Sequence, residues 1–184
     1  AQAVKRFREL VDPLIATPAR TTDPRGLSHR DAITGVQQAL YSPSLWGSLR
    51  GGLSSLADGN GDTLLLLADM YEGRSEDGTY SNINDAFNAI RCVDDPRITD
   101  RAVAGEADMQ FRHVAPFLDD GRGTGQAPLD VCAIWPVPNT GEPHTPDVPG
   151  LPPVLVVSTT EDPATPYQAG VDLARQLGGA LITF

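Results

Sequence analysis

The feature that most constrains the fold of this chain is a short apolar run near its C-terminal end, Val154-Leu-Val-Val-Ser158. The run is apolar and mostly β-branched on both faces, which is typical of a strand covered on both sides of a parallel sheet. A helical pattern follows over about 166–177, and a second apolar run covers 180–184. The sequence therefore predicts a strand-helix-strand unit within residues 151–184.

Asp162 and Pro163 lie just past the first predicted strand. Because proline lacks the N–H that a sheet needs, the strand cannot continue as a regular paired element, and Asp162 is expected in a turn. Functional residues of open α/β sheets collect at the carboxyl ends of the strands. Asp162 is therefore a candidate site residue, and an ordinary Asp-Pro turn is the alternative.

The first two thirds of the chain have helical patterns and no internal repeat. In the helix predicted over 2–15, Pro13 predicts either a kink or a new helical turn that begins with Asp12 as N-cap. Further helices are expected after Ser28, Ser42, Asp62 and Ser81, and over 99–118. The helix after Ser42 places Trp46 among its core residues. Prolines and glycines then crowd together, and this irregular segment, 121–153, is expected to link a mostly helical region, 1–150, to residues 151–184.

Charge and hydropathy exclude several classes of function. The chain has 24 acidic and 14 basic residues and a net charge of -10, whereas nucleic-acid binding needs a basic surface. No apolar run approaches the roughly 20 residues of a membrane span. Asp58-x-Asn60-x-Asp62 imitates a calcium loop, but Thr63 stands where the sharp turn needs glycine. We therefore predict no nucleic-acid partner, no transmembrane segment, no metal and no cofactor.

The segment from Val154 through Asp162-Pro-Ala-Thr165-Pro-Tyr into the following helix resembles the tripeptidyl-aminopeptidase-like family. These are secreted actinobacterial serine peptidases of the α/β-hydrolase fold, and the cell-envelope serine hydrolases of mycobacteria are the members that the chain resembles most. The resemblance implies a partial α/β-hydrolase. Residues 1–150 would be a mainly helical cap (lid) domain, and residues 151–184 the C-terminal strand-helix-strand portion of the core sheet.

The resemblance also implies roles for two residues near the end of the strand. Asp162 corresponds to the acid of a Ser-Asp-His triad, in which a carboxylate fixes the histidine tautomer and stabilises the imidazolium. Thr165 is interpreted as support for that acid, placed at a helix start where its oxygen can accept a backbone N–H.

The other two members of the triad have no candidate in this sequence. The fold uses the chain order serine, acid, histidine, with the serine in a G-x-S-x-G turn, and neither Gly52-Leu-Ser-Ser-Leu nor Gly26-Leu-Ser-His-Arg ends in glycine. All three histidines, at positions 29, 113 and 144, precede Asp162. We therefore expect a piece of a longer enzyme, inactive alone, with the serine before residue 1 and the histidine after residue 184.

Cys92 and Cys132 do not form a C-x-x-C pair, so the sequence gives no support to zinc or redox chemistry. The patterns around them, A-I-x-C-x-D and C-x-x-W-P, recur in the family, and the resemblance implies a disulfide between them. Two buried free thiols, or pairing with cysteines outside this piece, are the alternatives. A disulfide would suit an oxidising compartment, so we expect a secreted or cell-envelope protein, lipid-anchored if a missing N-terminal part carries the anchor.

The functional hypothesis is an exported serine hydrolase that cleaves peptide bonds, with an aminopeptidase as the nearest type. An esterase or lipase with the same triad is the first alternative, because acyl transfer from amides and from esters uses the same groups. A hydrolase-like binding module without activity is the second alternative.

Overall fold

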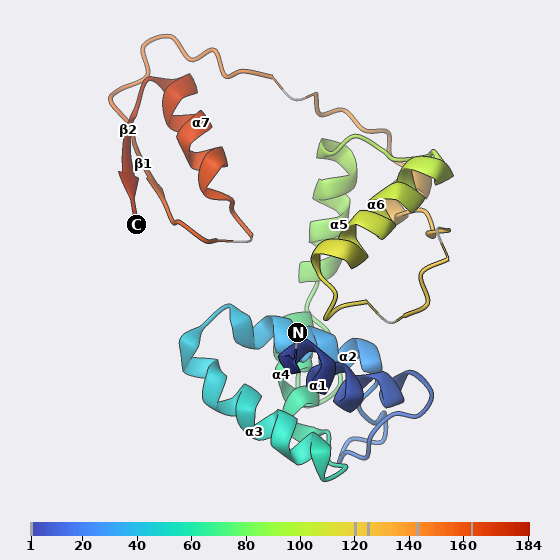
Figure 1. The fold of residues 1–184 in the computed structure, drawn as a ribbon. Coiled ribbons are helices and arrows are strands. Elements are labelled where there is room, and N and C mark those ends of the chain that lie inside the picture. Colours follow the sequence, from blue (N-terminus) through green and yellow to red (C-terminus); the bar gives the residue numbers. More distant parts are fainter. Residues whose placement is uncertain (1, 120, 125, 143, 163) are drawn as a thin grey trace. The chain divides into compact units, whose positions relative to one another are not determined.

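The computed structural model describes residues 2–119, 121–124, 126–142, 144–162 and 164–184. The chain divides into two compact units, Ala1–Gly141 and Glu142–Phe184, which are taken separately below (Figure 1). The division lies inside the segment 121–153. Assignment of the two units to a lid and a core stays a prediction.

Apart from isolated β-bridges, the regular secondary structure described in the first unit is helical. None of these helices, nor the one in the second unit, combines the length and apolar character needed to cross a membrane. The elements are α1 (Gln2–Val11), η1 (Asp12–Ile15), α2 (His29–Leu40), η2 (Pro43–Leu45), α3 (Trp46–Ala57), α4 (Asp62–Glu72), α5 (Ile83–Asp94), α6 (Arg101–Val114) and η3 (Val131–Ile134), where η marks a 3-10 helix.

Local sequence signals account for the start of α2 and the end of α1. Ser28 Oγ accepts the backbone N–H of Asp31 at 3.1 Å, and the Asp31 carboxylate accepts that of Ser28 at 3.3 Å, so a capping box begins the helix that was predicted after Ser28. Proline disfavours a continued α-helix, and α1 ends at Val11, two residues before Pro13. The chain continues as the 3-10 turn η1, which Val11 precedes without a side-chain cap, so Asp12 is not the N-cap.

The core of this unit forms where α2 and α4 pack closely. A Cβ atom built on Gly35 would lie 2.4 Å from the backbone oxygen of Leu64, so the two helix backbones approach to a distance that only glycine permits. The buried cluster around this contact consists of Val11, Leu14, Leu27, Ala32, Ala39, Leu56, Leu64, Leu65 and Leu67.

The prediction that Trp46 belongs to the core is wrong, because its side chain is 56% exposed. Leu56 of α3 belongs to the buried cluster. Leu45, in the turn before α3, and Leu49 and Leu53, in α3, pack against it. These residues recur every three or four positions and lie on one side of the helix, whereas Trp46 lies on the neighbouring side.

The starts of α4 and α5 and the bounds of α6 also differ from the predictions. Helix α4 begins at Asp62 itself, and the Asp62 carboxylate accepts the backbone N–H of Thr22 at 2.6 Å, so it holds a loop in place of capping the helix. Helix α5 begins at Ile83 after Asn82, not after Ser81. Helix α6 is shorter than the predicted 99–118 and begins after Asp100, whose carboxylate accepts the N–H of Ala102 at 2.7 Å.

A group of ion pairs attaches the loop before α2 to α4 at its C-terminal end. Arg25 lies 3.0 Å from a carboxylate oxygen of Asp23 and 2.8 Å from one of Asp69, and Arg74 approaches both acids at 3.5 Å. Hydrogen bonds from Arg25 lower the pKa of Asp23 to about 2. The loop and the helix end are therefore held together by charge at neutral pH.

The second unit is the predicted strand-helix-strand element. Strand β1 (Leu155–Ser158) pairs in parallel with β2 (Ala180–Thr183), with Leu155 opposite Ala180 and Ser158 opposite Thr183. Helix α7 (Tyr167–Leu177) connects the strands and packs against the sheet (Figure 1). A Cβ atom on Gly170 would lie 2.4 Å from Ser158 Oγ, so glycine allows the helix to lie close on β1.

The described residues of the second unit cover only one face of β1, so the expectation that both faces are covered stays a prediction for the longer protein. Ser158 is buried and Val156 half-buried, while Leu155 and Val157, on the other face, are 58% and 62% exposed. Ile182, opposite Val157 on β2, is 48% exposed. A single helix can cover only one face of a two-stranded sheet, because successive side chains of a strand point to opposite faces.

Candidate active site

The turn after β1 places Asp162 at the carboxyl end of the strand. Pairing with the C-terminal residue continues past Ser158, since Thr160 donates its N–H to the oxygen of Phe184 at 2.7 Å. Glu161 then has φ +61°, in the left-handed region that non-glycine residues seldom adopt. This residue turns the chain away from the sheet, and Asp162 follows it directly. Pro163 lies outside the described residues.

The Asp162 carboxylate is oriented by its own turn. Oδ1 accepts the backbone N–H groups of Ala164 at 2.8 Å and Thr165 at 3.0 Å, and Oδ2 accepts the Thr165 hydroxyl at 2.8 Å. These bonds lower the pKa of Asp162, with the Thr165 N–H as the largest cause, then the Thr165 hydroxyl and the Ala164 N–H. The side chain is half-buried. An ionised, fixed acceptor is thus present at the strand end at neutral pH.

A carboxylate offers about four acceptor positions, and the described contacts use two on Oδ1 and one on Oδ2. Among the described residues, the Oδ2 atom of Asp162 has no second donor. This oxygen can therefore accept one more N–H without losing a bond that it already makes.

Thr165 contacts Asp162, but not in the way that a helix-start position suggested. Helix α7 begins at Tyr167 after Pro166, with no side-chain cap at that end. Because the acidic acceptor lies only three residues earlier, the Thr165 hydroxyl donates to Oδ2 of Asp162. Thr165 therefore stabilises the charged form of the carboxylate and orients it, and the expectation that it accepts a backbone N–H is wrong.

Replacing Thr165 by valine is expected to raise the pKa of Asp162, because valine keeps the shape of the side chain but removes a donor to the charged form. Thr165→Ser keeps the hydroxyl and should leave the pKa low. An NMR titration of the Asp162 side-chain carboxyl in the two variants measures the difference. An unchanged pKa in Thr165→Val would mean that the hydroxyl does not hold the carboxylate in solution.

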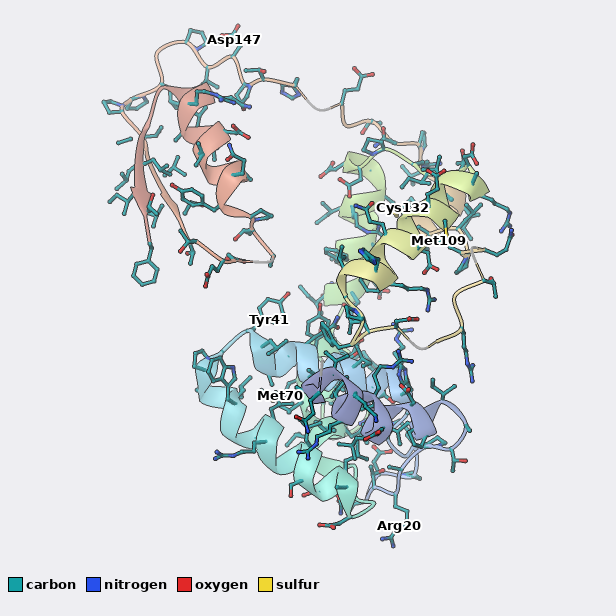
Figure 2. All side chains as sticks on the ribbon, viewed as in Figure 1. Arg20, Tyr41, Met70, Met109, Cys132 and Asp147 are labelled. Atoms are coloured by element: carbon teal, nitrogen blue, oxygen red, sulfur yellow. A yellow bond between two sulfur atoms is a disulfide. The ribbon has the colours of Figure 1, made fainter. Side chains whose placement is uncertain are left out.

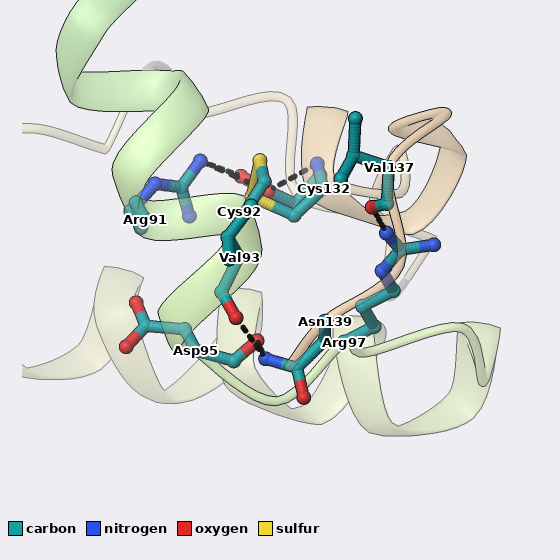
Figure 3. Close-up of a disulfide and its surroundings, with 9 residues drawn as sticks. Arg91, Cys92, Val93, Asp95, Arg97, Cys132, Val137 and Asn139 are labelled. Atoms are coloured by element: carbon teal, nitrogen blue, oxygen red, sulfur yellow. Dashed lines mark hydrogen bonds and ion pairs between the residues drawn. A yellow bond between two sulfur atoms is a disulfide. The ribbon is translucent and has the colours of Figure 1, made fainter. Parts of the chain in front are cut away.

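The first unit contains a disulfide between Cys92 of α5 and Cys132 of η3 (Figure 3). Both residues are buried, and Figure 2 marks the position of Cys132 among the surrounding side chains. Asp130 lies close to both sulfur atoms, but these are bonded to each other and are not available as metal ligands. The bond links α5 to a segment 40 residues further along the chain.

Polar contacts that sequence reasoning missed hold this segment beside α5. The Asp130 carboxylate accepts the backbone N–H of Cys132 at 2.8 Å and two contacts from Arg91 at 3.0 Å, and the Cys132 N–H, followed by Arg91, lowers its pKa. Asn139 donates to the backbone oxygens of Val93 at 2.8 Å and Asp95 at 2.7 Å (Figure 3). The position of Asp130, two residues before Cys132, could have predicted the first of these contacts, because an aspartate side chain commonly accepts the backbone N–H of the residue two positions later.

Within the second unit, no described histidine or serine donates a hydrogen bond to the carboxylate of Asp162. His29 begins α2, His113 lies in the last turn of α6, and the ring of His144 is 2.9 Å from the backbone oxygen of Glu142. Ser28 is used as a helix cap. Among the described residues, only Ala164 and Thr165 donate to the carboxylate of Asp162.

Comparison with known proteins finds a family model that matches the C-terminal part of the chain. Residues 115–183 match the family model described as TAP-like protein. This span contains Cys132, β1, the Asp162 turn, α7 and β2, so it includes the strand-to-helix segment that carries the resemblance, whereas the pattern around Cys92 lies outside it.

Individual relatives align with a larger share of the chain. It is 56% identical over its whole length to the serine protease Hip1 of Mycobacterium tuberculosis, and 59% identical to carboxylesterase B of the same organism. It is 26% identical over 83% of its length to a tripeptidyl aminopeptidase of Streptomyces lividans. The chain spans 37%, 36% and 28% of the lengths of these three relatives.

The segment that matches the family model contains the Asp162 turn. The resemblance to the tripeptidyl-aminopeptidase-like family is confirmed, because residues 115–183 match the model of TAP-like proteins and the whole chain is similar to mycobacterial proteins named as a serine protease and a carboxylesterase.

Proposed function

We propose that this chain is the helical lid and the acid-bearing part of the core of an exported serine hydrolase. Residues 1–150 act as the lid, and residues 151–184 supply one strand-helix-strand portion of an α/β-hydrolase sheet. The serine and the histidine come from the remainder of the same, longer protein. The length of the relatives supports a longer protein, since the chain spans only 37% of the serine protease and 36% of the carboxylesterase.

The observation that carries the proposal is the state of Asp162. Its carboxylate lies at the carboxyl end of a parallel strand, is kept ionised by Ala164 and Thr165, and retains an acceptor position on Oδ2. In the proposed reaction, that oxygen accepts the N–H of the catalytic histidine and fixes its tautomer. The other ring nitrogen of the histidine then removes the proton from the serine as the serine attacks the substrate carbonyl.

The substrates proposed are peptides, with esters as the second class. Both are acyl donors that a serine nucleophile opens through the same tetrahedral intermediate and acyl-enzyme. The names of the relatives support both classes, since one is a serine protease, one a tripeptidyl aminopeptidase and one a carboxylesterase.

A fluorophosphonate probe tests this proposal on the full-length protein. We expect one serine to be labelled, and we expect a tripeptide amide of aminomethylcoumarin to be hydrolysed, with short-chain nitrophenyl esters as the comparison substrates. A higher kcat/KM on the ester would favour the esterase. If the folded protein neither takes up the probe nor cleaves either substrate, it is a binding module with a hydrolase-like fold.

The disulfide supports the proposal that the protein is exported to the cell envelope. Cys92 and Cys132 are both buried in a formed bond, and such bonds persist in oxidising compartments. A lipid anchor would be carried by a part of the protein that precedes this chain. Recovery of the native protein solely from the cytoplasm, with its two thiols free, would contradict export.

A further inference from the structure

The first unit contains a cavity of about 420 Å³ that no part of the proposed hydrolysis uses. Helix α2 contributes Arg30, Ile33 and Thr34, the end of α4 contributes Glu72, and α6 and the residues after it contribute Phe111 and Leu118. Its volume lies within the range of small-molecule sites, which combine apolar walls with a few polar groups.

Thr34 is the buried polar residue of this cavity. It is only 7% exposed, it lines the cavity, and its hydroxyl has no hydrogen-bond partner among the described residues. The hydroxyl oxygen is, however, not among the described side-chain atoms that lack both a partner and solvent contact. It is therefore accessible from the cavity, where a polar group of a ligand can replace water as its partner.

The charged groups around the cavity differ in whether they are already paired. Arg112 contacts Asp108 at 2.8 Å and Asp119 at 2.7 Å, and Glu72 accepts the side-chain amide of Asn84 at 2.6 Å. Arg30, in contrast, has no ion-pair or hydrogen-bond partner in the described part of the chain. Arg30 is exposed to solvent, so water hydrates its guanidinium. Arg30 and the Thr34 hydroxyl are thus hydrogen-bond donors that remain available to a ligand in the cavity.

Arg30 and Thr34 can serve one ligand group together. They are four residues apart on α2, and residues at this spacing lie side by side on one helix face. The walls beside them are apolar, with Ile33 on the same helix and Phe111 and Leu118 from the other elements. The cavity thus places two donors next to an apolar surface.

We propose that this cavity binds an apolar group that carries a carboxylate, either the C-terminal residue of a peptide or a small N-acyl amino acid. The Arg30 guanidinium pairs with the carboxylate, the Thr34 hydroxyl donates to it, and the apolar side chain contacts Ile33, Phe111 and Leu118. This binding does not depend on hydrolysis, so it can hold whether or not the protein is an enzyme.

Titration of the full-length protein with three probes, followed by NMR, tests the proposal. N-acetyl-leucine has the proposed chemistry, N-acetyl-leucinamide lacks only the charge, and acetyl-Ala-Ala-Leu presents the same group at a peptide C-terminus. We expect the acid to shift the Thr34 amide signal and to bind at least about tenfold more tightly than the amide, as expected for a charged hydrogen-bonded pair. Tighter binding of the tripeptide would identify a peptide C-terminus as the ligand, and equal binding a small acid.

Matched variants separate this site from nonspecific attraction. Arg30→Gln and Thr34→Val should each weaken binding of N-acetyl-leucine, by about tenfold for Arg30→Gln. Arg50→Gln should leave it unchanged, because Arg50 is exposed on α3 and lies outside the cavity. Equal binding of acid and amide, an equal effect of Arg30→Gln and Arg50→Gln, or no saturable binding of any probe would each overturn the proposal.

Discussion

Replacing Asp162 by asparagine in the full-length protein is expected to lower kcat by about 10⁴-fold, the size of the loss that follows removal of a triad acid. Asparagine keeps the shape of the side chain and can still accept the Ala164 and Thr165 N–H groups through one oxygen. Its amide nitrogen, however, is a donor, so one of its two orientations presents N–H groups where the histidine needs an acceptor. The measurement is steady-state hydrolysis of the peptide and ester substrates.

A matched control separates this effect from a general loss of charge. Asp147 is an exposed aspartate of the same unit, and among the described residues it makes no hydrogen bond or ion pair (Figure 2). Asp147→Asn should leave kcat unchanged. Near-normal turnover of a folded Asp162→Asn protein would remove this residue from the reaction and leave the Asp-Pro turn as its only role.

Removing the disulfide with the double substitution Cys92→Ala and Cys132→Ala should lower the free energy of unfolding of the first unit by about 4 kcal/mol. A disulfide that spans 40 residues restricts the unfolded chain and lowers its conformational entropy. The estimate is the free energy of that entropy loss, which the variant no longer has. Both cysteines are also buried, so truncation of their side chains adds a packing loss. Urea denaturation without reductant measures the difference.

Arg91→Gln is the control for the disulfide. It keeps the bond but removes the ion pair between Arg91 and Asp130, in which the Asp130 side chain is 48% exposed. Such partly exposed pairs contribute at most about 1 kcal/mol. If the double cysteine variant lost no more stability than Arg91→Gln, the polar contacts of Asp130 and Asn139 would be sufficient to hold the segment beside α5.

The candidate acid combines two properties that usually conflict. A carboxylate with several donors is well oriented but often has no acceptor position left, whereas Asp162 keeps one on Oδ2 because Oδ1 accepts both backbone N–H groups. Glu161, in the left-handed conformation, precedes this arrangement directly. Such backbone conformations persist where the surrounding structure enforces them, and here pairing of Thr160 with Phe184 fixes the chain just before the turn.

Much of the local structure was predictable from the sequence because short-range rules decide it. The capping box of Ser28 and Asp31 needs only two side chains three residues apart, and the strand-helix-strand order of 155–183 follows from a change of hydrophobic period. Asp162 was identified because proline after it ends regular strand pairing. The pairing of Cys92 with Cys132 came from the family resemblance and not from spacing.

The tertiary structure decided the features that depend on which residues meet across the chain. Asp62 accepts a hydrogen bond from the loop at Thr22 and does not cap α4, and the side chain of Trp46 is exposed. Thr165 donates its hydroxyl to Asp162, and no side chain caps α7. Sequence periodicity specifies an element and its apolar side, since both depend on neighbours a few residues away. Partners of polar groups, close contacts such as Gly35 with Leu64, and the cavity beside Thr34 depend on packing between distant segments, which no local pattern contains.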